Sequence, residues 1–255
     1  MLPLNEVQRL QWKCNGVLQV DNLLTKEEVI ELRDLYDSFM NGTIDTSKHR
    51  YDLGAGESKK LDSIENITQV MWPSDIVPSL REHPMRKRCE ELVRYIYEDE
   101  TFDFDFDMLI AKAPNTNTPT PPHQDQAYWI ELSDKRAVSI WISLDEATLD
   151  NGCMWYSPRS HLGPLRKHWR AGDNPNAGLT CEASEDEMSP MPLQPGGAGL
   201  HAGRTLHYSR GNKTSGWRRA YIINLRPRAM IEAERSQGFD HGRAGHKTHD
   251  VRSVL

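Results

Sequence analysis

The sequence predicts a mainly β protein, an antiparallel sandwich or barrel flanked by N-terminal helices. Strand-like segments separated by turn residues follow one another through the second half of the chain, whereas helical patterns lie before residue 100. Hydrophobic residues make up 37% and charged residues 27% of the 255 residues, as in globular proteins with an ordinary core. Chains of this length commonly form one β domain, so we expect a single domain over residues 1–235 and a polar tail over 236–255.

Two helices are predicted in the first 100 residues. The first follows Thr25, whose side chain can cap it, and Glu28 three residues later completes a capping box. Apolar residues then recur at helical spacing until Asn41-Gly42 ends the pattern, and a short strand over residues 16–20 precedes it. The second helix is expected over residues 84–97, where the apolar residues share one side.

Strands dominate from residue 102 onward. Residues 102–107 alternate phenylalanine with aspartate, which is the period of a half-buried strand, and the strand continues to Lys112. Further strands are expected at residues 137–144, 153–156, 205–209 and 217–225. The long polar segment over residues 165–195 is a candidate lid or a plain surface excursion.

Charge and hydropathy narrow the possible partners. The net charge is −6 and no basic cluster can follow a phosphate backbone, so a small or neutral partner is expected and nucleic acid is not. No window of eighteen apolar residues is present, and the first residues do not resemble a signal peptide. We therefore expect no membrane segment and a cytoplasmic location. Four scattered cysteines, without Cys-x-x-Cys spacing, are expected to be free thiols, and the oligomeric state is left open.

The stretch PPHQDQAYW, residues 121–129, places His123 and Asp125 two residues apart. On an extended backbone both side chains point to the same side and can converge on one ion. Two histidines and one carboxylate on one face of an iron(II) ion leave positions open for other ligands. A His-x-Asp pair also arises by chance as a hydrogen-bonded surface pair, so a third ligand is required. His207, just before a turn-rich loop, is the best candidate.

Arg218 and Ser209 extend this predicted site. If the strands on either side of the loop after Ser209 pair as a hairpin about the loop centre, Arg218 lies opposite His207 on the same face. Its guanidinium can then hold a carboxylate with two hydrogen bonds, and Ser209 can donate to the same group. This arrangement suits a dicarboxylate whose other end chelates the metal. A surface salt bridge is the alternative for Arg218.

These motifs resemble the phytanoyl-CoA dioxygenase family of iron(II)- and 2-oxoglutarate-dependent oxygenases. The resemblance runs over residues 100–225, in order and spacing, through His123–Asp125, Trp141–Asp145, Asn151–Met154, Pro158–His161, and His207–Ser209 with Asn212 and Arg218. One departure is Arg159, where the family often has glycine. If the turn needs a left-handed backbone, arginine is strained there.

The resemblance implies a double-stranded β-helix, or jelly roll, in which His123, Asp125 and His207 bind Fe(2+). It further implies 2-oxoglutarate as cosubstrate and dioxygen as oxidant, and cosubstrate contacts are implied for Arg218, Ser209, Trp141, Met108 and Lys112. The implied reaction is hydroxylation of an unactivated C–H bond of a small metabolite. The intact carboxylate argues against halogenation, because the related halogenases lack it. Desaturation and ring closure stay open.

A non-catalytic jelly-roll protein, or a cupin-like protein that binds a metal or small molecule, is the alternative. It would be marked by a missing ligand or a missing arginine, and neither is missing. Gln126, Tyr128 and Trp129 follow the metal motif and are expected at the cavity or its rim, or else in packing. Trp72 and residues 165–195 are candidates to close the cavity. No basic cluster suits the phosphates of coenzyme A, which favours a free metabolite.

The other histidines are expected to be structural. The resemblance assigns His161 to a turn, whereas His168 and His201 belong to no motif and are expected in the core or on the surface. The tail from Ser236 to Leu255 is expected to be loose, and a metal role for its three histidines, His241, His246 and His249, would rest on spacing alone.

Overall fold

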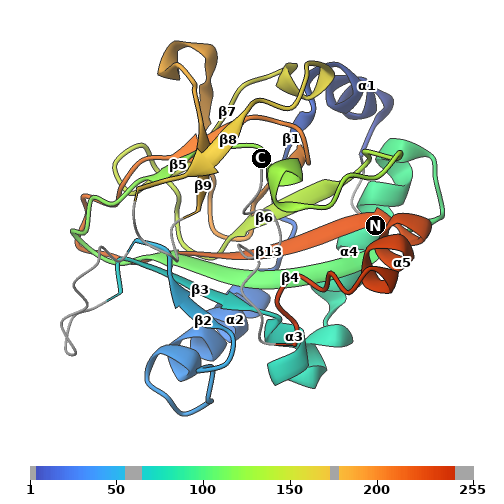
Figure 1. Ribbon diagram of the computed structural model, residues 1–255. Coiled ribbons are helices and arrows are strands. Elements are labelled where there is room, and N and C mark those ends of the chain that lie inside the picture. The colour runs from blue at the N-terminus through green and yellow to red at the C-terminus, as the bar shows by residue number, and fades with distance from the viewer. Residues whose placement is uncertain (1–3, 55–64, 173–177, 245–255) are drawn as a thin grey trace.

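A computed structural model describes residues 4–54, 65–172 and 178–244, and it confirms the predicted jelly roll with N-terminal helices (Figure 1). The larger sheet has seven strands, in the order β1 (Val17–Val20), β11 (Ala198–Ala202), β6 (Val138–Ser143), β13 (Arg218–Pro227), β4 (Phe102–Lys112), β3 (Ile67–Met71) and β2 (Arg50–Asp52). The smaller sheet has four, in the order β10 (Ser189–Met191), β7 (Met154–Tyr156), β12 (His207–Ser209) and β5 (Thr120–His123). All pairings between the named strands are antiparallel.

The helices begin where the sequence offers caps. Thr25 and Glu28 form the predicted capping box of α2 (Lys26–Met40). The same device, with Asn5 and Gln8, begins α1 (Glu6–Asn15), a helix that the sequence analysis did not anticipate. The second predicted helix is α4 (Pro84–Tyr97), and the remaining helices are the short α3 (Pro73–Ile76) and the C-terminal α5 (Arg228–Ser236). Single 3-10 turns lie at η1 (Pro78–Arg81), η2 (Asp125–Tyr128), η3 (Ser160–Leu162) and η4 (Glu185–Glu187).

The main core lies between the helices and one face of the larger sheet. Leu32 of α2 and Val93 of α4 are buried in one cluster with Leu109, Ile140 and Ile223, which come from three adjacent strands. Because side chains alternate along a strand, the neighbouring residues of β4, β6 and β13 point to the opposite face. That face is turned toward the smaller sheet, so the space between the sheets becomes the place for a site.

The predicted hairpin between the last two strands is wrong. β12 pairs with β5 and β7 in the smaller sheet, whereas β13 pairs with β4 and β6 in the larger one. His207 therefore lies opposite His123 and Tyr156, and Arg218 lies opposite Lys112. The turn-rich loop carries the chain from one sheet to the other, as jelly-roll connections do, so the two residues approach the cavity from different sheets.

The C-terminal segment also differs from the expected loose tail. Residues 237–244 fold back onto the domain after α5, and Phe239 and His241 are only 3% and 1% exposed. The sequence signal is weak because this burial depends on contacts with distant elements and not on a local apolar period. His246 and His249 lie outside the described residues, and the domain boundary at residue 235 stays a prediction.

The candidate lid over residues 165–195 contains regular structure. It includes a two-stranded sheet, β8 (His168–Arg170) with β9 (Leu179–Cys181), and after β9 the chain continues through η4 to β10.

The four cysteines are free, with Cys14 exposed and the others buried. Within the part of the chain that the structure describes, no helix is both long enough and apolar enough to cross a membrane.

Candidate metal centre and cosubstrate pocket

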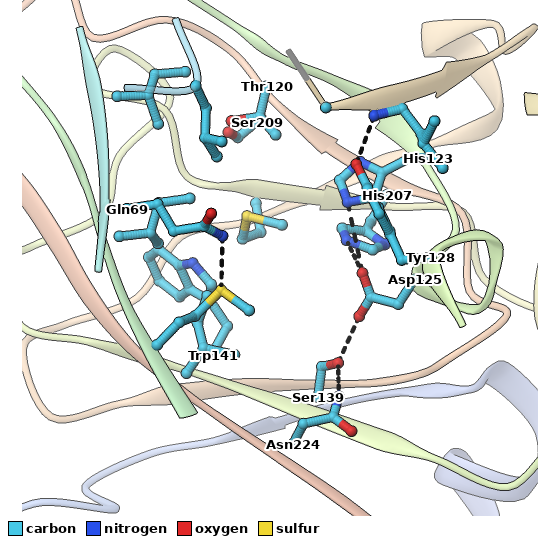
Figure 2. A pocket seen from close by; sticks show the side chains of 18 of the residues that line it. Gln69, Thr120, His123, Asp125, Tyr128, Ser139, Trp141, His207, Ser209 and Asn224 are labelled. Carbon is cyan, nitrogen blue, oxygen red and sulfur yellow. Dashed lines mark hydrogen bonds and ion pairs between the residues drawn. The ribbon is translucent and has the colours of Figure 1, made fainter. Parts of the chain in front are cut away.

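The three predicted ligands meet between the sheets. His123 ends β5, Asp125 opens η2, and His207 begins β12, directly across from His123 in the smaller sheet. Oδ1 of Asp125 lies 3.6 Å from Nε2 of His123 and 3.5 Å from Nε2 of His207. Figure 2 shows the three side chains together at one side of the cavity. The structure thus brings together residues that are 84 positions apart at most (207 − 123).

The hydrogen bonds of the two histidines suit a metal. Nδ1 of His123 lies 2.8 Å from the carbonyl oxygen of Pro121, and Nδ1 of His207 lies 2.9 Å from that of Thr205. A carbonyl oxygen only accepts, so each Nδ1 carries the proton and each Nε2 presents a lone pair. Two imidazole lone pairs and one carboxylate oxygen that face one point are a donor set for iron(II) or a similar ion.

The second oxygen of Asp125 is held by groups that the sequence analysis did not identify. Oδ2 accepts a hydrogen bond from Oγ of Ser139 at 2.5 Å and lies 3.1 Å from Nε2 of His201. Asn224 in turn donates to Oγ of Ser139 at 2.8 Å (Figure 2). The carboxylate plane is therefore fixed, and Oδ1 is left to face the two imidazoles.

Burial and neighbouring charge set the ionisation of the site. Burial alone would raise the pKa of Asp125, but the neighbouring imidazoles of His207, His123 and His201 lower it well below its ordinary value. Burial lowers the pKa of His207 well below its ordinary value, and the nearby His201 and His123 lower it further. An ionised carboxylate beside a neutral imidazole is the protonation state that binds a metal ion.

Arg218 lies farther along the cavity, where no carboxylate of the described residues pairs with it. The residue is 1% exposed, its guanidinium carbon lies 5.2 Å from the ring centre of Trp141, and burial lowers its pKa to about 10. Among the described residues, Nε and Nη1 of Arg218 and Oγ of Ser209 have no hydrogen-bond partner. Buried polar groups are normally paired, so this arginine and serine are arranged for an anion that the cavity would receive.

The other predicted cosubstrate residues have different positions. Trp141 and Met108 line the cavity. Lys112 lies behind it, fully buried beside Arg218, and its Nζ donates to the carbonyl oxygens of Thr118 and Ser209 at 2.9 and 3.4 Å. Burial, with a further contribution from Arg218, lowers the pKa of Lys112 well below its ordinary value. The lysine thus holds backbone next to the arginine, and a direct cosubstrate contact stays a prediction.

Of the three predicted substrate residues, two line the cavity and one does not. Tyr128 and Trp129 line the cavity, whereas Gln126 is not among the lining residues and accepts a hydrogen bond from Nε of Arg204 at 2.9 Å. Leu179 of β9 also lines the cavity, and its amide donates to Oη of Tyr128 at 2.6 Å. Part of the candidate lid therefore contacts the segment that follows His123 and Asp125, two of the predicted metal ligands.

A family model described as phytanoyl-CoA dioxygenase (PhyH) matches residues 12–220. The chain belongs to the phytanoyl-CoA dioxygenase family. Phytanoyl-CoA dioxygenase domain-containing protein 1 of Mus musculus is 32% identical over 110 residues, which cover 41% of this chain and 38% of the relative. The match thus spans less than two fifths of that relative's length. The dioxygenase andF of Emericella variicolor is 25% identical over 88% of this chain and 74% of its own.

Solved structures extend the comparison. The crystal structure of EvdO2 from Micromonospora carbonacea var. aurantiaca has a TM-score of 0.72 and 31% identity, over 87% of this chain and 90% of that chain. A crystal structure of EvdO2 with bound 2-oxoglutarate has a TM-score of 0.71 and 29% identity over the same shares. The two folds therefore correspond over nearly their whole lengths.

The chain keeps the fold of the family despite its unusual turn. Arg159 has a left-handed backbone with φ of 70°, and its amide donates to the carbonyl oxygen of Asn15 at 2.8 Å. The anticipated strain is thus present, and α1 holds the turn in place. His161 of the same turn packs against Gly16, where a Cβ atom would overlap the imidazole ring.

His168 lies near the predicted metal motif, where its Nε2 accepts a hydrogen bond from the amide of Gln124 at 3.1 Å.

Proposed function

We propose that this protein is an iron(II)- and 2-oxoglutarate-dependent dioxygenase that hydroxylates an unactivated C–H bond of a small metabolite. The observation that supports it most is the pairing of two features in one cavity. His123, Asp125 and His207 present three donor atoms to one point, and farther along the same cavity lies a buried Arg218 whose Nε and Nη1 have no partner among the described residues. The 2-oxoglutarate bound by the related EvdO2 has the carboxylates that these two features would receive.

Each residue has a distinct part in the proposed reaction. His123, Asp125 and His207 would hold Fe(2+) on one face, and Ser139 with His201 would keep Oδ1 of the carboxylate directed at it. Arg218 and Ser209 would bind the far carboxylate of 2-oxoglutarate. When metal, cosubstrate and dioxygen are bound, they supply the oxidation in which 2-oxoglutarate becomes succinate and carbon dioxide and a C–H bond becomes C–OH.

The proposal is tested by the weak visible charge-transfer band of an iron(II)–2-oxoglutarate chelate under anaerobic conditions. We expect the band with the wild-type protein, and a weaker apparent affinity for 2-oxoglutarate in Arg218→Ala. The control is Arg219→Ala, because Arg219 points to the other side of β13 and pairs with Asp145 at 2.9 Å. If folded wild-type protein gives no band, the proposal is wrong.

A second measurement separates turnover from binding. A non-catalytic metal protein would form the chelate without consuming it, whereas a dioxygenase releases succinate when dioxygen is admitted with a mixture of small metabolites. Succinate release above the level without metabolites would support the hydroxylase. If no succinate is released under any condition, the binding-protein alternative is favoured.

The cytoplasmic location stays a prediction.

A further inference from the structure

The cavity has a second wall farther along β13 and β4, away from Arg218. Arg218 lies opposite Lys112 at one end of these strands, and Asn224 lies opposite Phe106 six positions farther along β13 (224 − 218). Six positions of strand correspond to about 20 Å at roughly 3.3 Å per residue. Phe106, Asn224 and His241 all line the cavity at this far end. The cosubstrate anchor and the far wall are therefore separate places in one cavity.

The far wall contains an imidazole that is fixed from several sides. Nε2 of His241 lies 3.1 Å from Oε2 of Glu234 and 3.4 Å from Oδ2 of Asp105. The carbonyl oxygen of His241 accepts a hydrogen bond from Nε1 of Trp72 at 3.1 Å, and its ring stacks on Phe106 with the ring centres 4.2 Å apart. These contacts fix both the position of His241 and the orientation of its ring.

This cluster is close enough to bind a metal, but its charges already balance. Asp105, Glu234 and His241 have ligand atoms within 4.8 Å of one another. Nε of Arg226 donates to Asp105 at 2.6 Å, Arg226 also contacts Glu234, and Arg235 contacts Asp105. Two guanidinium groups neutralise two carboxylates, so these four groups have no net negative charge to attract a metal ion. The cluster therefore serves to hold the histidine.

The backbone that carries His241 is costly to form. Gly238, His241 and Gly242 have φ values of 79°, 53° and 77°, which is the left-handed region. Glycine reaches this region freely, but a histidine does so at a cost in free energy. A strained residue that is held by buried charges and lines a cavity indicates a function for its side chain.

The charges of the cavity indicate what kind of molecule it takes. Asp125 and Arg218 are the lining residues with a formal charge within the described chain, and the proposed function assigns one to the metal and the other to 2-oxoglutarate. The wall near His241 is formed by apolar side chains, among them Met71, Phe106 and Met108. A charged group on the substrate would lose its water there without gaining a counter-charge.

The contacts of His241 also determine the role of its other nitrogen. The polar contacts of the ring within the described chain are all made by Nε2. Nη2 of Arg226 also lies 3.2 Å from Nε2, but its two N–H groups face Asp105 and Glu234. Carboxylates accept only, so Nε2 carries the proton that faces Glu234, and in the neutral ring Nδ1 is an acceptor. A hydroxyl group in the cavity is the complementary donor.

We propose that the cavity binds an uncharged, largely apolar substrate with a hydroxyl group, and that Nδ1 of His241 accepts the hydrogen bond of this hydroxyl. The inference rests on the proposed function, since the metal and 2-oxoglutarate must occupy the two charged residues. His241 is then a residue that determines specificity, supplied by the C-terminal segment.

The test uses probes that share an apolar body and differ in charge. Cyclohexylmethanol, cyclohexanecarboxylate and cyclohexylmethylammonium form one set, and the corresponding naphthyl compounds form a second. Their dissociation constants are measured by ligand-observed NMR on protein loaded with 2-oxoglutarate and zinc(II), which replaces iron(II) without paramagnetic broadening. We expect the alcohol of at least one set to bind at least tenfold more tightly than its charged partners.

Two substitutions at one position separate recognition from folding. His241→Gln places an amide near the position of Nε2 and loses the acceptor at Nδ1, so alcohol binding should weaken at least fivefold. His241→Asn keeps an acceptor near Nδ1 and tolerates the left-handed backbone, so alcohol binding should stay within twofold of wild type. Circular dichroism and melting temperature show that each variant is folded.

The inference is overturned if charged probes bind as tightly as alcohols, if neither alcohol binds, or if the Gln and Asn variants behave alike. These outcomes are distinct from failure of the proposed function, which is read from the charge-transfer band without any probe. A normal band with charged probes preferred would reject only the substrate inference. An absent band would reject the oxygenase itself.

Discussion

At the scale of single residues, the two oxygens of Asp125 have different partners. Oδ1 faces the imidazoles of His123 and His207, whereas Oδ2 is held by Ser139 and His201. A carboxylate that is free to rotate would spend part of its time in orientations that bind no metal. The groups on Oδ2 should therefore contribute to metal affinity without touching the ion.

Ser139→Ala tests this contribution. Loss of the 2.5 Å hydrogen bond to Oδ2 should weaken iron(II) affinity about 10-fold to 100-fold, as is usual for groups that orient a metal ligand. Affinity is measured by competition with a metal chelator under anaerobic conditions. The control is Ser143→Ala on the same strand, whose Oγ donates to the carbonyl oxygen of Asp145. Equal effects of the two substitutions would contradict this role for Ser139.

Asp107 is a residue whose charge should cost stability. Burial raises its pKa from 3.8 to about 6, although hydrogen bonds from Tyr221 and Ser74 oppose the shift. The folded state thus favours the protonated acid, so this group contributes stability below pH 4 that is lost as the pH rises through 6. A difference of roughly two pKa units between the folded and unfolded states lowers the free energy of unfolding by about 3 kcal/mol at a pH well above both pKa values.

Asp107→Asn should therefore increase the free energy of unfolding at pH 8, by up to about 3 kcal/mol, because the amide is never ionised. The gain should shrink as the pH falls below 6 and disappear below 3.8, where the wild-type carboxyl becomes protonated in both states. Urea unfolding at a series of pH values measures it. A gain that is independent of pH would show that some other effect of the substitution is responsible.

At the scale of elements, two loops next to Lys112 and Arg218 contact each other. The loop over residues 113–119 and the loop over residues 210–217 are joined by hydrogen bonds from Asn117 to Asn212, at 3.0 Å, and from Asn115 to Thr214, at 2.9 Å. The backbones approach so closely that a Cβ atom on Gly211 would overlap the backbone of Asn117. Their contact sets the distance between Lys112 and the strand ends at Ser209 and Arg218.

Gly211→Ala should separate these loops. We expect a loss of about 1–3 kcal/mol in the free energy of unfolding, as in other overpacked sites, and a weaker apparent affinity for 2-oxoglutarate. Gly216→Ala in the same loop is the matched control, because a Cβ atom there meets open space. Urea unfolding and titration of the charge-transfer band measure the two effects. Unchanged stability in Gly211→Ala would contradict the close packing of the loops.

The elements also show what the sequence could predict. The bounds of β4 and α4 follow from strong local periods, and both match the structure at residues 102–112 and 84–97. Strand pairing does not follow from local patterns. The turn-rich loop after Ser209 suits a hairpin as well as a crossover, and the apolar contacts that decide between them are distant in sequence. The short strands β2, β3 and β8 to β11 lack alternation long enough to be recognised.

At the scale of the whole molecule, the sequence was enough to propose the three metal ligands but not the residues that support them. His123 and Asp125 belong to a compact motif, which has a recognisable spacing. His201 meets Asp125 only because β11 pairs with β6, in a register that places His201 opposite Ser139. The contact joins residues 76 positions apart and depends on a strand that the sequence analysis did not anticipate. Positioning residues of this kind require the assembled sheets.

Arg226 links three parts of the molecule and gives the last prediction. It is fully buried on β13 and pairs with Asp105 of β4 and Glu234 of α5. Arg226→Met would leave the two carboxylates with one guanidinium within the described chain, that of the partly exposed Arg235, and with the imidazole of His241. Removing one partner of a buried ion pair typically costs about 3–5 kcal/mol, a large part of the stability of a domain.

Urea unfolding should therefore show a loss of that size for Arg226→Met, and about 1 kcal/mol or less for Arg228→Met. Arg228 is the matched control, because its side chain is 61% exposed and its pair with Asp103 is solvated. Adding Glu234→Gln to Arg226→Met should restore part of the loss, since one uncompensated charge is removed. If both arginine variants lost the same small amount, the buried cluster would not be what fastens the C-terminal segment to the sheet, and the fixed position of His241 would need another cause.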